Sequence, residues 1–222
     1  MLSTHIIVYT IYLAAFVYSI ILHEIAHAWV AKECGDPTAE AAGRITLNPI
    51  PHIDPIMSIA LPAIMLYTGQ PLIGGAKPVP VNPYNFRHLE RDDLKVSLAG
   101  VAVNFLIALV FGFMLHLFEP GTINYTLFGS IAVLNIVLGI FNLIPIPPLD
   151  GSHVMRLLLS RIDPGIAAAY ERIGFFGLVI IVLLLQANLL HLSGAIEFVW
   201  HRVFLIDNAS WQDVMYLLRH ST

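Results

Sequence analysis

The sequence has little charge and almost no cysteine. Only 12% of its 222 residues are Asp, Glu, Lys or Arg, and 57% are hydrophobic, whereas a soluble domain has roughly 25% charged residues. This composition excludes an ordinary soluble domain and indicates an integral membrane protein. Cys34 is the only cysteine, so no disulfide can form within the chain.

A basic surface is also missing. The formal net charge is −4, and no run of Lys and Arg is interleaved with aromatic residues, so nucleic acid is not an expected partner. The lipid bilayer is an expected partner, and the sequence carries no indication of oligomeric state. The first apolar run has no basic segment before it and exceeds the length of a signal peptide, so we interpret it as retained.

Four apolar runs are long enough to cross a bilayer, which takes about 20 residues of helix. They cover residues 6–32, 96–118, 125–144 and 173–190. These runs predict an all-α membrane protein built as a polytopic bundle of four transmembrane helices. A fifth apolar piece, residues 55–67, is shorter and contains Pro62, so it is either re-entrant or a tilted crossing.

The positive residues indicate the orientation of the chain. Six of them flank the short piece on both sides: Lys32, Arg44, Lys77, Arg87, Arg91 and Lys95. The residues before Ile6 and the stretch 119–124 contain no Lys or Arg. The positive-inside rule therefore places residues 32–54 and 76–95 in the cytoplasm, which favours re-entry of residues 55–67 over a crossing.

Two further segments have a recognisable composition. Residues 76–83 read A-K-P-V-P-V-N-P, and alternate prolines predict a small extended or β segment. Its Val79 and Val81 are candidates for binding an unwound substrate by strand pairing, and a rigid spacer is the alternative. Residues 193–222 alternate apolar and polar residues, which predicts an amphipathic interfacial helix or a helix packed on the core formed by residues 1–192.

The first apolar run carries three ionisable residues in the sequence H-E-I-A-H at residues 23–27. Such groups are costly in lipid and are retained mainly where they pair, bind an ion or take part in chemistry. Positions i and i+4 share a helix face, so His23 and His27 are expected to ligate one Zn²⁺. Glu24 is then placed to act as the general base. In the disfavoured alternative the three residues are structural: the two histidines cap a helix near the membrane interface, and the glutamate pairs with a lysine.

A catalytic zinc needs a third protein ligand. Asp150 is the best candidate, because it is the only acidic residue between Glu119 and Asp163 and the expected topology returns it to the depth of His23. The prolines before it break the helix, and Gly151 allows a close turn. The alternative role of Asp150, as the N-cap of a following helix, is compatible with the first.

Three segments in this order resemble the site-2 protease family of intramembrane zinc metalloproteases. They are H-E-I-A-H at 23–27, G-V-A-V-N at 100–104 and N-L-I-P-I-P-P-L-D-G at 142–151. Val101 stands where the family usually has proline, and we expect the compact form without a PDZ-like domain. Residues 43–54, G-R-I-T-L-N-P-I-P-H-I-D, together with residues 76–83, resemble the compact bacterial and archaeal branch. This resemblance implies a multi-pass protein of a prokaryotic cell membrane with its active site towards the cytoplasm.

The resemblance also implies roles for individual residues. His23, His27 and Asp150 would be the zinc ligands, Glu24 the general base, and transmembrane proteins the substrates. Asn142 falls where the family has an asparagine proposed to steady the substrate or the oxyanion, and hydrogen bonding between helices is its alternative role.

Two other classes of function remain open. A catalytically silent membrane protein would use the same site to bind metal or clients, but Glu24 would then be a costly residue without a purpose. A metal transporter would line successive helices with further acidic or histidine residues, and the run 96–118 offers only His116.

Overall fold

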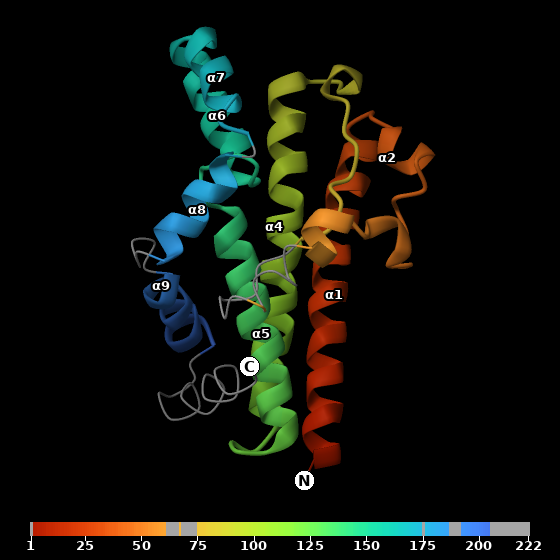
Figure 1. Ribbon diagram of the computed structural model, residues 1–222, viewed down its shortest axis with the longest axis vertical. Coiled ribbons are helices and arrows are strands. Elements are labelled where there is room, and N and C mark those ends of the chain that lie inside the picture. The colour runs from red at the N-terminus through yellow and green to blue at the C-terminus, as the bar shows by residue number, and fades with distance from the viewer. Residues whose placement is uncertain (1, 61–66, 68–74, 175, 187–191, 205–222) are drawn as a thin grey trace. The chain divides into compact units, whose positions relative to one another are not determined.

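The computed structural model describes residues 2–60, 67, 75–174, 176–186 and 192–204 (Figure 1). Every regular element in these ranges is a helix, and they contain no β-strand. The chain forms two compact units, residues 17–100 and residues 1–16 together with 101–222, and each is described by itself. Two long helices, α1 (Leu2–Glu33) and α4 (Leu89–Met114), contribute residues to both units.

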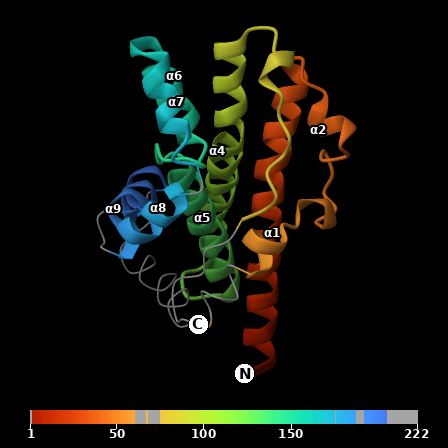
Figure 2. The ribbon, with the colours of Figure 1, turned by 45° about the horizontal axis from the view of Figure 1, so that its top comes forward.

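The unit of residues 17–100 consists of the second half of α1, the start of α4 and the chain between them. The shorter elements of that connection are α2 (Thr38–Ala41), the 3₁₀ helix η1 (Ile50–His52), the π-helical turn η2 (Pro55–Ala60) and the 3₁₀ helix η3 (Pro83–Asn85). A small core joins α1, α4 and the connection: Ala31, Cys34, Phe86 and Val96, with Val30 and Val81 packed against them. Residues 75–82 run beside α1 without forming a regular element (Figures 1 and 2).

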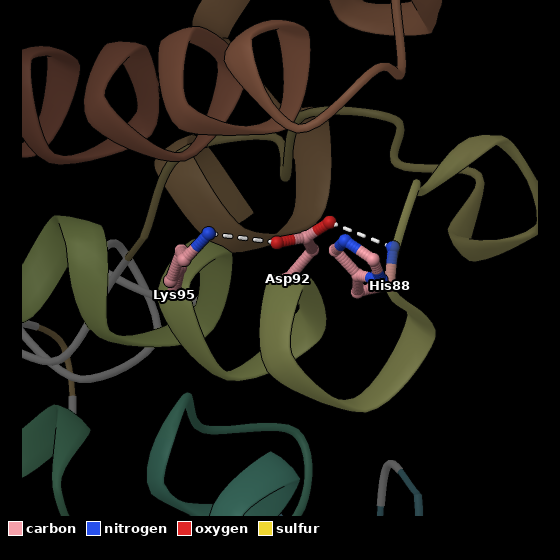
Figure 3. Close-up of polar contacts among 3 residues, drawn as sticks. All are labelled: His88, Asp92 and Lys95. Carbon is pink, nitrogen blue, oxygen red and sulfur yellow. Dashed lines mark hydrogen bonds and ion pairs between the residues drawn. The ribbon is translucent and has the colours of Figure 1, made fainter.

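The start of α4 is fixed by a buried carboxylate. Asp92 accepts the backbone N–H of His88 at 2.9 Å and the ammonium of Lys95 at 2.8 Å, as Figure 3 shows. The N–H of Asp92 in turn donates to the His88 carbonyl at 2.8 Å. A carboxylate in the first turn of a helix accepts from N–H groups that have no partner within the helix. Its negative charge also interacts favourably with the positive end of the helix dipole. These bonds set where α4 begins, and therefore where Val96 and Gly100 lie along it.

The other unit is a helical bundle with an aromatic core. Its elements after α4 are η4 (Leu115–Leu117), α5 (Ile123–Asn142), α6 (Gly151–Ile162), α7 (Pro164–Glu171), α8 (Phe176–Gln186), α9 (Leu192–Phe198) and the π-helical turn η5 (Val199–Val203). Trp200 and Phe204 are fully buried in a cluster with Ala108, Ala132 and Ile136. Gly112 makes room for Phe204, because a Cβ there would lie 2.5 Å from the ring.

Polar contacts inside this unit join elements far apart in the sequence. Asn104 of α4 donates its amide N–H to the Asn135 side chain of α5 at 3.0 Å, and both residues are fully buried. Paired amides of this kind hold helices together where water is absent. The helices α6 and α7 lie side by side as a hairpin (Figures 1 and 2), and Tyr170 of α7 donates to the Pro145 carbonyl at 2.9 Å.

Within the described residues the expected all-helical architecture is confirmed, and three helices there are long and apolar enough to span a bilayer. They are Thr10–Glu33, Leu89–Leu117 and Ile123–Asn142. The fourth expected span, residues 173–190, is not confirmed. Its described helix α8 has 11 residues, about 16 Å at 1.5 Å per residue, and residues 187–190 lie outside the described ranges.

Three other expectations fall partly outside the described residues. Of the short piece 55–67, residues 61–66 lie outside, so its path stays a prediction. Residues 205–222 of the C-terminal segment also lie outside, and the division of the chain at residue 192 stays a prediction. The β character expected for residues 76–83 is not confirmed: residues 76–82 have no strand pairing, and residues 83–85 form η3.

Candidate metal centre

His23 and His27 face each other on α1, one helical turn apart. Their Nε2 atoms lie 3.0 Å apart, with the rings edge to face at a centroid distance of 4.6 Å and an interplanar angle of 80°. Both side chains are buried, at 7% and 8% exposure. The i, i+4 spacing therefore brings two imidazole nitrogens to one point, as the sequence predicted.

The tautomer of His27 follows from its other nitrogen. Nδ1 lies 2.6 Å from the backbone carbonyl oxygen of Val96, and a carbonyl can only accept, so Nδ1 carries the proton and donates. In a neutral imidazole this leaves a lone pair on Nε2, the atom that faces His23. Metal-binding histidines usually donate their other N–H to a carboxylate, a backbone carbonyl or water, which fixes the ring, and here the partner is a carbonyl.

Gly100 creates the space that the two rings occupy. A Cβ at this position would lie 2.6 Å from Cε1 and 2.7 Å from Nδ1 of His23, and closer still to Nε2 of His27. Only glycine avoids this overlap, because it has no side chain. Gly100 is the first residue of the G-V-A-V-N segment at 100–104, and the structure identifies the imidazole pair as its neighbour.

The imidazole pair fits a zinc ion. Zn–N bonds of about 2.0–2.1 Å in tetrahedral geometry place two ligand nitrogens roughly 3.3 Å apart. The observed separation is 3.0 Å, so a small ring rotation suffices. Neutral imidazole nitrogens on a buried helix face are also ligands that zinc prefers.

Glu24 lies between the two histidines in sequence and is half-buried. Its Oε2 accepts the backbone N–H of Val79 at 2.8 Å. This bond fixes the orientation of the carboxylate beside the histidines. Nothing in the sequence indicated it, because the contact joins residues 55 positions apart.

The segment around Val79 is attached to the protein at several points. The N–H of Lys77 donates to the His52 carbonyl at 2.8 Å, and that of Asn82 donates to Asp36 at 2.7 Å. Because Pro78 and Pro80 have no N–H, three of the four N–H groups in residues 77–82 bond to other parts of the protein. This explains why the segment forms no strand, since its donors are used by side chains and by a loop.

Asp36 binds the C-terminal end of this segment through Asn82. It is fully buried and accepts hydrogen bonds from the N–H and hydroxyl of Thr38, the N–H of Asn82 and the amide of Asn85. Burial raises the pKa of its carboxyl, but the hydrogen bonds from Thr38, Asn85 and Asn82 outweigh burial and hold the pKa below its ordinary value.

A lowered pKa makes the protein less stable in acid. The ionised carboxylate stabilises the fold at any pH above the unfolded pKa of about 3.9, and this contribution is lost as the pH falls through the lower folded pKa. We therefore expect the melting temperature in detergent to fall as the pH drops below about 4. Asp36→Asn, measured by the same scans, should cost about 1–3 kcal/mol at neutral pH and lose part of the acid dependence. An unchanged acid dependence in this variant would contradict the assignment.

Asp150 and Asn142 lie together in the other unit, at the turn between α5 and α6. Asp150 occupies the N-cap position of α6, but its side chain makes no capping hydrogen bond. Gly151 is required for the turn, because a Cβ there would collide with the Leu143 carbonyl. Asn142, half-buried at the end of α5, donates from Nδ2 to the Leu138 carbonyl of its own helix at 3.0 Å. An amide nitrogen carries a second N–H, so this bond does not use up its donors.

The structure thus brings His23, His27, Glu24 and Val79 together in one unit, with Gly100 beside the histidines. Asp150 and Asn142 belong to the other unit. A helix-borne histidine pair with an adjacent glutamate, in a helix apolar enough to span a membrane, defines a membrane metallopeptidase by its residues and their spacing.

Comparison with known proteins identifies the family. Residues 118–185 match the model of "Peptidase family M50". The chain is 36% identical to "Putative zinc metalloprotease YwhC" of Bacillus subtilis (strain 168) over 177 residues, which are 75% of each chain. It is 30% identical to "Putative zinc metalloprotease Rip2" of Mycolicibacterium smegmatis over 185 residues, 82% of this chain and 69% of that one. No solved structure matches.

The chain belongs to peptidase family M50, the site-2 protease family that its motifs resemble. This membership confirms the expected enzyme class, a zinc metalloprotease, and the expected cofactor. Together with the three long apolar helices it identifies a multi-pass membrane protein.

Proposed function

We propose that the protein hydrolyses peptide bonds of transmembrane protein substrates inside the bilayer. The observation that carries this proposal is the position of the histidine pair along α1. At 1.5 Å per residue, His23 lies about 20 Å from Thr10 and about 15 Å from Glu33, the two ends of the candidate membrane span. If this helix crosses the hydrocarbon core of about 30 Å, the site lies within the core.

His23 and His27 would hold the zinc through Nε2, and Asp150 would be the third ligand. This set of two imidazoles and one carboxylate leaves one position of a tetrahedral site open. Bound zinc supplies Lewis-acid activation of a water molecule and of the scissile carbonyl. Val96 keeps the His27 ring in the tautomer that presents a lone pair to the metal.

Glu24 would take the proton from the attacking water and give it to the leaving amine. The Val79 N–H holds Oε2 and thereby the plane of the carboxylate. Asn142 would steady the substrate or the developing oxyanion with an amide N–H. The substrate helix must unwind before this step, because a helical peptide group is shielded and already hydrogen-bonded.

Residues 76–83 are the proposed contact for the unwound substrate, with Val79 and Val81 at its centre. The contacts of this segment narrow the proposal. The Val79 N–H is engaged by Glu24, and the Val81 side chain packs on the core. The carbonyls of Lys77 and Pro78 accept from Arg44, so the segment would pair mainly through the backbone carbonyls that follow Pro78 and through the Val81 N–H. An extended segment beside the general base is well placed to present a substrate to it.

The proposed topology has four spans, with α8 and the residues after it forming the fourth, and residues 55–67 re-entering from the cytoplasmic side. The protein would lie in a prokaryotic cell membrane, and its site would draw water from the cytoplasmic side. The positive residues between Lys32 and Lys95 support this orientation.

Replacing Asp150 tests the ligand set. Asp150→Asn should lower zinc affinity by at least about 100-fold, because changes behind the ligands alone cost 10–100-fold. Zinc binding to the purified protein in detergent, measured by competition with a chelating dye, gives this value. Asp163→Asn is the matched control, since Asp163 is exposed and caps α7. Unchanged zinc affinity in Asp150→Asn would remove Asp150 from the set.

Two assays distinguish the proposed protease from the competing functions. A catalytically silent metal- or client-binding protein would bind zinc without cleaving a model transmembrane substrate. A transporter would carry zinc across a proteoliposome membrane, and the proposed protease would not.

A further inference from the structure

Arg44 is buried although it is a cation on a connecting segment, with 5% of its surface exposed. Its Nη1 donates to the Pro78 carbonyl at 3.3 Å and its Nη2 donates to the Lys77 carbonyl. Both acceptors are neutral, and within the described ranges no carboxylate forms an ion pair with Arg44. Burying a cation against neutral acceptors is costly. The planar fork of arginine holds two adjacent carbonyls in a fixed geometry, whereas the ammonium of lysine is a compact group on a flexible stem.

The carbonyls held by Arg44 lead directly to Glu24. The Pro78 carbonyl and the Val79 N–H are the two ends of one planar peptide group. Arg44 donates to its oxygen and Glu24 accepts from its nitrogen, at 3.3 and 2.8 Å. Hydrogen bonds at the two ends of a peptide group polarise it and strengthen each other. Pro80 favours an extended Val79, which further fixes the orientation of the group.

We propose that Arg44 is a positioning residue, which orients the Glu24 carboxylate through the Pro78–Val79 peptide group. This inference rests on the proposed role of Glu24 as general base. It assigns to the segment 76–83 a task besides contact with the substrate, namely to hold the base in place. It also explains why a cytoplasmic-side arginine is buried rather than solvated.

The test compares Arg44→Lys with wild type and with Arg91→Lys, a matched control on the exposed surface of α4. The readouts are kcat and KM on a transmembrane peptide in detergent micelles, zinc content, melting temperature and amide hydrogen exchange of residues 75–83. The exchange measurement is unusually clean, because three prolines leave few exchangeable amides in this segment. We expect kcat to fall about 10–100-fold, as small misplacements of catalytic groups do, with KM changed less than about twofold. Zinc content should stay unchanged while exchange in residues 75–83 accelerates.

A second variant tests whether Arg44 acts on Glu24 through the Val79 N–H. Val79→Pro removes the N–H that reaches Glu24 and leaves Arg44 in place, so it should lower kcat without loss of zinc. If Arg44 acts through this N–H, the double variant should be no slower than the worse single variant. Should Arg44→Lys fail to fold, Val79→Pro alone decides whether the peptide group orients the base.

The outcomes distinguish this inference from the proposed function. If Glu24→Gln is inactive and Arg44→Lys turns over like wild type, the inference is wrong and the proposed function stands. Two other results for Arg44→Lys also overturn the inference. One is faster amide exchange in residues 75–83 with unchanged kcat, and the other is a loss of zinc that matches the loss of kcat. If Glu24→Gln keeps its turnover, the proposed function itself fails.

Discussion

Glu24→Gln is expected to stop turnover while zinc stays bound. Glutamine keeps the size of the side chain and can still accept the Val79 N–H, but it cannot take a proton. General acid–base catalysis contributes about 10²–10⁴-fold, so kcat on a transmembrane substrate should fall by at least 100-fold. The measurement is product formation by purified protein in detergent, with zinc content determined on the same samples.

The control for this prediction is Glu33→Gln, which removes an exposed carboxylate from the end of the same helix. It should keep full activity and full zinc content. A Glu24→Gln protein that cleaves at more than about a tenth of the wild-type rate would remove Glu24 from the role of base.

Gly100→Ala is expected to remove zinc and, with it, activity. The added methyl group would overlap both imidazole rings, with 2.6 Å to Cε1 of His23, so at least one ring must leave its position. The backbone of α4 cannot retreat easily, because the Val96 carbonyl on the preceding turn is bonded to His27. Overpacking costs about 1–3 kcal/mol, so the protein should still fold. The two histidines, however, would no longer be placed to bind one zinc ion. Zinc content and melting temperature, measured together, separate these effects.

Gly139→Ala is the matched control in another long helix. The nearest atoms to a Cβ at Gly139 would be those of the Phe105 ring, at 3.0 Å, so a small ring movement accommodates it. Zinc content should then equal that of wild type. Stoichiometric zinc in Gly100→Ala would show that the rings do not occupy the observed positions when the metal is bound.

The sequence predicted the local parts of this site and missed the distant ones. Spacing alone places His23 and His27 on one helix face, and the structure confirms this at 3.0 Å between Nε2 atoms. The hydrogen-bond partners of His27 and Glu24 could not be predicted. They are the Val96 carbonyl and the Val79 N–H, backbone groups that every non-proline residue has. Gly100 was part of a quoted motif, but the residues it contacts depend on how the two helices are aligned, which the motif does not give.

Hydropathy was a reliable guide for long helices and a poor one for short segments. The three longest apolar runs appear as α1, α4 and α5, because an apolar stretch of that length has one stable conformation in lipid. The alternating prolines of residues 76–83 predicted an extended segment, but not that its N–H groups bond within the protein instead of in a sheet. Arg44 was counted only as one of six positive residues that indicate orientation, and the sequence did not show that it is buried against that segment.

Mapping the cleavage site in a transmembrane substrate tests the central claim most directly. Wild-type protein and Glu24→Gln would be reconstituted with a single-span model substrate in liposomes, and the products identified by mass spectrometry. The account predicts wild-type cleavage within the apolar span of the substrate, abolished by a zinc chelator and absent with Glu24→Gln. Cleavage confined to residues outside that span, or equal cleavage by the two proteins, would contradict it.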